Sequence, residues 1–270
     1  MKLNRIAYFS ILLIVLEGCN HVSFKGKQSS QASEPTKAEN APTQPESEIK
    51  GTAPQKERLV TETNQADPSS KSQIKLGFCA EFIEVAAKSN PWLAGAKVGT
   101  ELRYPETVAV SDRAPDESPV LLDGNCIAQS KKLIFETEST ANWPDGSLPQ
   151  SGEGKVDIIA LFKLGAIRGF SNLIAPFDSL VAVFLDENDE NKNAAPENLD
   201  FSSPASRNFQ QLEPRLHQVF FIGDGKTSAG TFQRFVVPSG AKRIALGNMS
   251  FHQWKKNTGS HRVRINELLP

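Results

Sequence analysis

The residues with the most evident chemical potential lie near the C-terminal end of the chain, at positions 248–259. Phe251, His252 and Trp254 could form an aromatic shelf for a sugar ring, because such rings pair an apolar face with a polar rim. The alternative is that Trp254 fills one end of a protein core, where large aromatic side chains are usually buried. The segment is therefore either a ligand-binding loop or a packing loop.

The sequence shows little sign of catalysis. It contains no Gly-x-Ser-x-Gly, Cys-x-x-Cys, His-Glu-x-x-His or phosphate-binding Gly-x-x-x-x-Gly-Lys motif. His261 falls on the inward face of a predicted strand, so we expect a hydrogen-bonded packing residue there. We expect a non-enzymatic protein without a cofactor, although a pair of carboxylates remote in sequence would escape such a search.

An acidic segment at residues 186–197 imitates the spacing of an EF-hand calcium loop. Asn191 stands where that loop needs glycine, and Pro196 precedes Glu197, the would-be bidentate ligand. A predicted strand, rather than a helix, leads into the segment. We interpret it as a solvated hairpin loop and expect no metal site.

The N-terminus predicts the compartment. Lys2 and Arg5 flank an apolar run at residues 6–16 that is too short to span a bilayer. The following Leu-Glu-Gly-Cys ends at Cys19 and resembles a bacterial lipobox, which implies a lipid-modified cysteine anchored in a membrane. Asn20 follows instead of aspartate, which in Gram-negative lipoproteins indicates the outer membrane. An ordinary secretory signal peptide is the alternative.

The other two cysteines, Cys79 and Cys126, form an even pair in an oxidising compartment. A disulfide between them is the simpler interpretation. Two separately buried thiols are the alternative, because spacing alone does not show that the two side chains meet.

The organisation predicted from composition is a signal peptide at residues 1–18, a disordered tether at 19–73 and one folded domain at 74–270. Residues 25–77 contain no aromatic side chain and are rich in Ser, Thr, Gln, Glu, Lys and Pro. Such a segment buries too little apolar area to offset the entropy lost on ordering.

The folded domain is predicted to be all-β, a β-sandwich or jelly roll with one short helix. Apolar runs bounded by Gly, Pro, Asn or Asp predict the strands. They lie at residues 78–86, 120–122, 133–137, 179–185, 219–222, 232–237, 244–246 and 260–265. Ser203-Pro204 predicts a helix start, with Phe209, Leu212 and Leu216 on one helical face, although Pro214 must end or kink this short helix.

Several stretches resemble a group of secreted bacterial proteins. They are FFIGDG at residues 220–225, FVVPSGAKRIALG at 235–247, M-x-x-x-x-W-x-x-N-x-G at 249–259, NPWLAG at 90–95 and APFDSL at 175–180. The group has a galactose-binding-like β-sandwich, similar to the small bacterial galactophilic lectin (PA-IL-like), and many members carry a PEP-CTERM sorting tag. The resemblance covers about residues 85–265.

In the lectin-type relatives the loop before the last strand holds calcium through an aspartate and two adjacent asparagines. This chain has Ser250 at the aspartate position and Lys256 at the first asparagine, so that only Asn257 matches. Calcium requires six to eight oxygen ligands, with carboxylates among them. The resemblance therefore implies a sugar site that works without calcium.

The charge distribution suggests the kind of ligand. Residues 215–266 hold nine Lys or Arg against one acid, although the net charge of the chain is only −1. We expect an anionic glycan, bound by Lys255, Lys256, Arg262 and Arg264 with Trp254 as the apolar contact. The alternatives are a structural or protein-binding envelope lipoprotein with a degenerate sugar site, and a glycan hydrolase. We expect no nucleic-acid partner, and the oligomeric state is left open.

Overall fold

The computed structural model describes residues 58–64, 67–104, 111–142, 151–162, 167–188 and 194–269. The chain divides into two units, residues 1–51 and 52–270, and all described residues belong to the second. Cys19 and the predicted signal peptide lie outside the described residues. Within the described part, no helix has the length and apolar character needed to cross a membrane.

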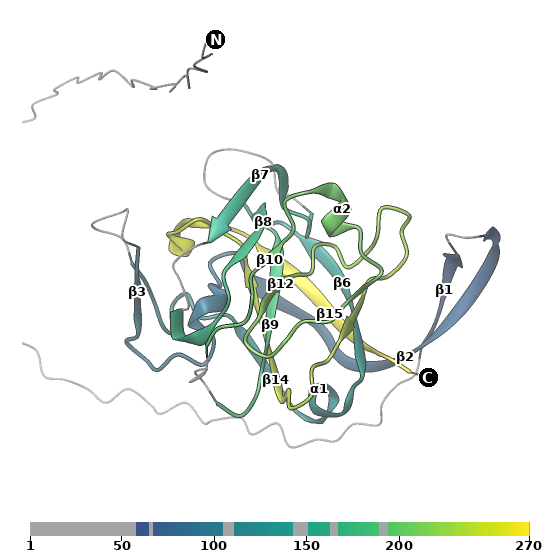
Figure 1. Ribbon diagram of the computed structural model, residues 1–270, viewed down its shortest axis with the longest axis horizontal. Coiled ribbons are helices and arrows are strands. Elements are labelled where there is room, and N and C mark those ends of the chain that lie inside the picture. Colours follow the sequence, from purple (N-terminus) through teal and green to yellow (C-terminus); the bar gives the residue numbers. More distant parts are fainter. Residues whose placement is uncertain are drawn as a thin grey trace, which may run out of the picture. The chain divides into compact units, whose positions relative to one another are not determined.

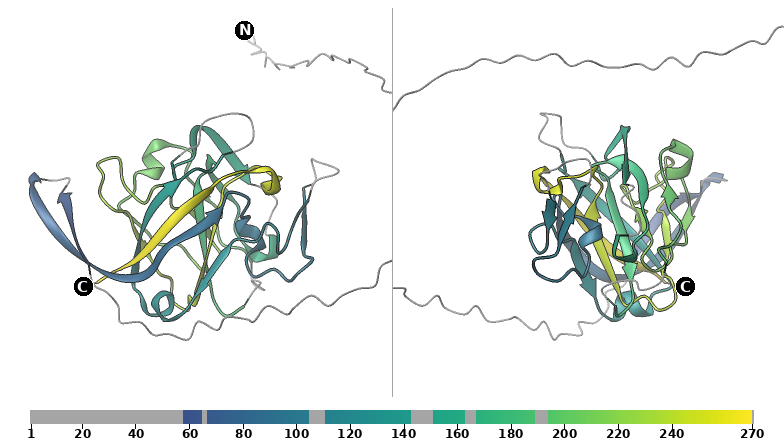
Figure 2. Two further views of the ribbon diagram at one scale, coloured as in Figure 1. Left: turned by 180° about the vertical axis from the view of Figure 1, so that it is seen from behind. Right: turned by 60° about the vertical axis from the view of Figure 1, so that its left-hand side comes forward.

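The largest sheet has six strands and contains the end of the chain (Figure 1). In spatial order they are β1 (Arg58–Asn64), β2 (Asp67–Ala86), β15 (Ser260–Leu268), β6 (Lys132–Ser139), β13 (Arg234–Val236) and β11 (Gln211–Leu212). All neighbours are antiparallel except β11 and β13. The hairpin of β1 and β2 extends from the edge of the domain (Figure 2).

A second, four-stranded sheet is antiparallel throughout. It runs β12 (Val219–Phe221), β9 (Leu180–Leu185), β14 (Arg243–Asn248) and β5 (Val120–Asp123). A three-stranded sheet has the order β10 (Leu199–Asp200), β8 (Leu173–Phe177) and β7 (Lys155–Phe162). A two-stranded sheet pairs β3 (Glu101–Arg103) with β4 (Ser111–Arg113). The helices are short: η1 (Pro91–Leu93), α1 (Asn125–Gln129), η2 (Ile167–Gly169), α2 (Pro204–Arg207) and η3 (Trp254–Lys256). The described chain is thus mostly β-strand, as predicted.

The core has two halves because β9 is buried on both faces. Leu180, Ala182 and Phe184 join side chains of the six-stranded sheet, such as Phe135 and Val263, in one apolar cluster. The alternate residues of β9 enter a second cluster that also contains residues of β7, β8 and η1. A continuous apolar run is what such a doubly covered strand requires, and its sequence predicted this position.

The other predicted strands are also present, with boundaries that differ by a few residues, except that β2 begins at Asp67 instead of Phe78. The first described strand starts at Arg58, however, inside the segment that composition assigned to the tether. There Val60 and Ile74 pack against buried Leu76, so a few alternating apolar residues form a hairpin within an otherwise polar segment. Seven of the described strands were not predicted: β1, β3, β4, β7, β8, β10 and β11.

The predicted helix start is confirmed, but the helix is shorter than the apolar spacing suggested. Ser203 caps α2 with its hydroxyl, Pro204 follows, and the helix ends at Arg207. Phe209, Leu212 and Leu216 therefore share no helical face, although all three still pack on the core from irregular chain and β11.

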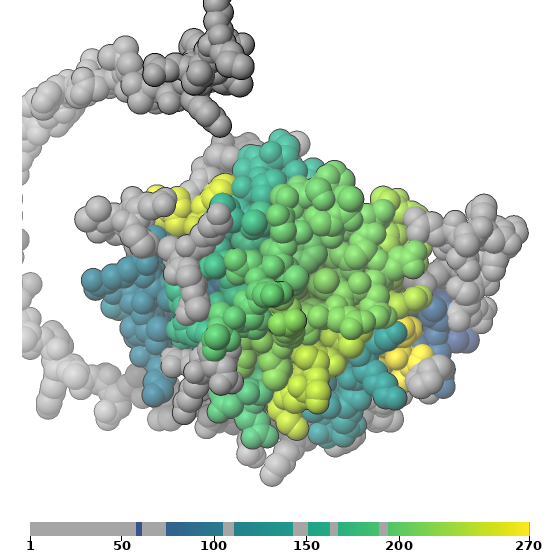
Figure 3. Space-filling view, viewed as in Figure 1, coloured from purple at the N-terminus to yellow at the C-terminus, as the bar shows by residue number. Residues whose placement is uncertain are grey.

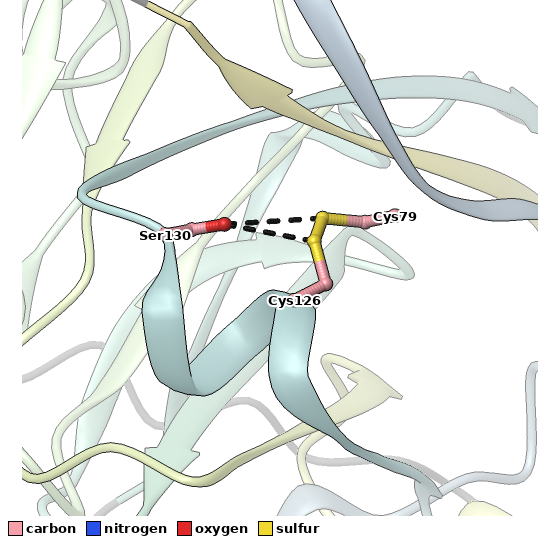
Figure 4. Close-up of a disulfide and its surroundings, with 3 residues drawn as sticks. All are labelled: Cys79, Cys126 and Ser130. Atoms are coloured by element: carbon pink, nitrogen blue, oxygen red, sulfur yellow. Dashed lines mark hydrogen bonds between the residues drawn. A yellow bond between two sulfur atoms is a disulfide. The ribbon is translucent and has the colours of Figure 1, made fainter. Parts of the chain in front are cut away.

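The disulfide between Cys79 of β2 and Cys126 of α1 is present, as predicted (Figure 4). The two Cα atoms are 5.6 Å apart, and the Ser130 hydroxyl lies 3.5 Å from the Cys126 sulfur. Because α1 directly follows β5, the bond ties the six-stranded sheet to the edge of the four-stranded sheet.

Candidate functional site

The loop at residues 249–259 is organised around Trp254, which is fully buried. Its ring lies at 5.6 to 6.1 Å, between centroids, from those of Phe162, Trp92 and Tyr104. The indole N–H donates to the Asn248 carbonyl oxygen at 2.6 Å. The indole therefore has no exposed face on which a sugar could stack, and the packing interpretation describes this residue.

A distant carboxylate holds the start of η3. Asp112 of β4 is fully buried, and its two oxygens accept the backbone N–H groups of Trp254 at 3.1 Å and Lys255 at 3.2 Å. The Tyr104 hydroxyl donates to the same carboxylate at 2.5 Å. Burial, followed by the charge of Asp112, raises the pKa of Tyr104 well above its usual range, so this hydroxyl stays a donor.

A second buried network lies under the other end of the loop. The side-chain oxygen of Asn248 is 3.0 Å from His261 Nε2, and its amide nitrogen donates to Asp178 at 3.4 Å. Asp178 in turn faces the ammonium of Lys155 at 3.8 Å, with both side chains buried. Burial lowers the pKa of His261 to about 3, so the ring is neutral at physiological pH. His261 is thus a hydrogen-bonded packing residue, as predicted.

Ser250, Lys256 and Asn257, the three positions that the resemblance to galactophilic lectins aligned with calcium ligands, lie in different surroundings. Ser250 is fully buried, and its hydroxyl donates to the His252 carbonyl at 3.2 Å. The Asn257 side chain donates to the Ala87 carbonyl at 3.0 Å, while Lys256 is exposed. Among the described residues, no group of three or more His, Cys, Asp or Glu side chains could hold a metal ion.

We call four solvent-accessible residues of this loop, Phe251, His252, Lys255 and Lys256, the loop tip. Phe251 is 41% exposed, and its ring stacks on that of Phe177 with centroids 5.1 Å apart. His252 is partly exposed, while Lys255 and Lys256 are exposed. The tip therefore combines two cations with one exposed aromatic ring, that of Phe251, whereas Trp254 is buried.

Arg262 and Arg264 were expected to join these lysines, but they occupy the outer face of the six-stranded sheet. Arg262 pairs with Glu138 at 2.7 Å and Arg264 with Glu136 at 4.0 Å. Both guanidinium groups also lie within 5 Å of the Phe82 ring centroid. Because side chains alternate along β15, these arginines point away from the face that carries His261. Their charge is already balanced by neighbours.

The acidic segment at residues 186–197 borders a pocket of about 700 Å³. His217 lies at its wall with a positive φ of 60°, and its Nε2 is 3.8 Å from Asp186. Burial lowers the pKa of His217. Residues 189–193, the centre of the EF-hand-like pattern, lie outside the described residues.

Comparison of the chain with known proteins adds no relative to this description. No family model matches it, and neither the curated proteins nor the solved structures include a match.

Proposed function

We propose that this protein is a non-enzymatic, glycan-binding module of the bacterial cell envelope, anchored through a lipid on Cys19. In this proposal the domain is a galactose-binding-like β-sandwich, and its ligand is an anionic glycan bound at the loop tip without calcium. The two large sheets that share one apolar core support the sandwich assignment. The segment between Cys19 and the domain acts as a tether.

The exposed ring of Phe251 carries the binding proposal. The Phe251 side chain is 41% exposed, and its ring is supported by stacking on Phe177. A preorganised apolar face costs little entropy when a sugar ring packs on it. Lys255 and Lys256 make no ion pair with other described residues, so both charges are available to a carboxylate or sulfate group.

The test uses alginate as an anionic probe and dextran as a neutral one. Alginate binding to the purified domain should weaken as sodium chloride rises, because exposed charges are screened within about 8 Å at physiological ionic strength. Phe251→Ala and the double variant Lys255→Gln/Lys256→Gln should each lower affinity. Lys242→Gln, at an exposed lysine in the turn between β13 and β14, is the matched control.

Equal binding of dextran and alginate, or loop-tip variants that bind as the wild type does, would contradict the proposed site. Complete absence of glycan binding would favour the alternative, a structural or protein-binding envelope lipoprotein. One observation favours that alternative: Val156, Ile158 and Leu161 are each at least 40% exposed on β7, an edge strand.

Anchoring is tested separately. Cells that are fed a labelled fatty acid should label the wild-type protein but not the Cys19→Ala variant. Labelling of that variant at the wild-type level would contradict the lipoprotein assignment, while leaving the glycan-binding test unaffected.

A further inference from the structure

A pocket of about 260 Å³ lies between β7, α2 and the turn that follows β12. Figure 3 shows the face of the domain on which β7 and α2 lie side by side. The residues that line the pocket come from three separate segments: Glu153 and Val156; Pro204, Arg207 and Asn208; and Asp224, Lys226, Thr227 and Ser228. The pocket shares no residue with the loop tip.

Two glycines allow the wall of this pocket to form. A Cβ atom at Gly152 would lie 2.2 Å from the carbonyl oxygen of Gly223, and one at Gly223 would lie 2.2 Å from a Glu153 oxygen. Gly223 also has a positive φ of 65°, which side chains disfavour. The close approach brings Glu153 against the turn, where its carboxylate accepts the Asp224 N–H at 3.2 Å.

The polar groups of the pocket retain hydrogen-bonding capacity. Arg207 is 8% exposed and donates through one Nη atom to the carbonyls of Phe201 and Ser202, while its Nε lies 3.9 Å from Glu153. The Asn208 oxygen accepts both the N–H and the hydroxyl of Ser228, which leaves the amide nitrogen as a donor. The pocket therefore offers both donors and acceptors to a ligand.

We infer that this pocket binds one hexopyranose ring of a glycan, with Glu153 and Asp224 accepting from its hydroxyls and Arg207 and Asn208 donating to them. Each sugar hydroxyl both donates and accepts, so neighbouring hydroxyls require the mixture of partners found here. Val156 and Pro204 provide apolar surface for the C–H groups of the ring.

Charge and size exclude the other obvious ligands. The Asp224 carboxylate, joined by that of Glu153 when it is ionised, opposes an anion, and the cations of Arg207 and Lys226 oppose a metal ion or an amine. A neutral ligand therefore fits best. Drug-sized ligands occupy pockets of about 300–1,000 Å³. The smaller volume here suits a single sugar ring.

Saturation-transfer NMR on the folded domain tests the inference. The probes are the methyl glycosides of glucose, galactose, mannose and N-acetylglucosamine. We expect transfer to at least one of them, and a loss of affinity of about tenfold in Glu153→Gln and in Asp224→Asn, the effect of one hydrogen bond to a charged group. Asp157→Asn, at the exposed position next to Val156 on β7, is the control and should bind as the wild type does.

The pH dependence gives a second readout. Burial raises the pKa of Glu153 to about 7, against a smaller lowering by the Asp224 N–H. The charged groups that face it are Arg207 from α2 and Asp224 from the turn. An ionised carboxylate accepts stronger hydrogen bonds than a neutral one, so affinity should rise between pH 6 and pH 8, by up to about tenfold. The Glu153→Gln variant should lack this rise.

Absence of transfer to all four glycosides would overturn the inference, and so would transfer that persists unchanged in both pocket variants. The inference does not depend on the loop tip, because the pocket and the loop tip share no residue. Phe251→Ala should therefore leave glycoside binding at the pocket unchanged. If alginate does not bind at the loop tip but a glycoside still binds in the pocket, the proposed loop-tip site is wrong and the inference about the pocket stands.

Discussion

Asp112 and Trp254 are separated by 142 positions in the chain, yet the carboxylate of one accepts the backbone N–H of the other at 3.1 Å. The same carboxylate accepts the N–H of Lys255 and so satisfies two groups that η3 leaves without a partner within the helix. The loop tip is therefore positioned by a strand pair, β3 and β4, that lies outside both large sheets.

Replacement of Asp112 should lower the stability of the folded domain. Asp112→Ala leaves the Trp254 N–H and the Tyr104 hydroxyl buried without this acceptor, and each such group costs about 1–3 kcal/mol. The partly buried N–H of Lys255 loses its acceptor as well. We expect the free energy of unfolding in urea to fall by about 3 kcal/mol or more. Asp116→Asn, at an exposed position a few residues further along, should change it little. Equal stability of Asp112→Ala and the wild type would show that the cap contributes nothing.

The sequence could predict the strands around this loop but not the role of its tryptophan. An apolar run such as residues 180–185 reports local periodicity, which is enough to identify β9 as a buried strand. The burial of Trp254 depends on Trp92 and Phe162, which come from distant parts of the chain. Local pattern contains no information about such contacts, so both interpretations of Trp254 remained open.

The Glu153 pocket shows the same limit more strongly. Its residues come from three segments that have no motif in common, and β7, which supplies Val156, was not predicted as a strand. The only local signals are Gly152 and Gly223, which permit the close approach of two chain segments. A glycine in a loop has many other causes, so these positions alone predict no site.

The disulfide between Cys79 and Cys126 should be a major source of stability. Closing a loop between residues 47 positions apart restricts the unfolded chain, which corresponds to about 4 kcal/mol in the chain-entropy model. A reducing agent should lower the melting temperature of the wild type and leave a Cys79→Ser/Cys126→Ser variant unaffected. Non-reduced peptide mapping should find one cross-linked pair, and two freely alkylated thiols in protein purified without reducing agent would contradict the assignment.

His261 should make the protein sensitive to acid. Burial lowers its pKa from 6.5 to about 3, so between these values the unfolded state binds a proton that the folded state does not. The contribution of His261 to the free energy of unfolding is therefore fully present above about pH 6.5. Between about pH 6.5 and pH 3 the free energy of unfolding falls by about 1.4 kcal/mol per pH unit as the pH is lowered. The lowered pKa of His217 acts in the same direction.

The variant His261→Gln can still hydrogen-bond to Asn248 but does not titrate, so its loss of stability between pH 7 and pH 5 should be smaller. His252→Gln, at a partly exposed ring, should retain the full pH dependence. Urea unfolding at the two pH values measures both. An unchanged pH dependence in His261→Gln would show that this histidine is not the group responsible.

Calcium should have no effect on the wild-type protein. Ser250 is buried with its hydroxyl donating to a carbonyl, Asn257 is engaged with Ala87, and Lys256 brings a positive charge to the remaining ligand position. A metal that binds only the folded state stabilises it by mass action, so millimolar calcium and a chelator should give the same melting temperature. The double variant Ser250→Asp/Lys256→Asn introduces a carboxylate and an amide. In chelator it should be less stable than the wild type, because the new carboxylate is buried. Addition of calcium should restore its stability. A clear rise in the wild-type melting temperature with calcium would show instead that the loop binds the metal through other oxygens, and the calcium-free glycan site would then have to be abandoned.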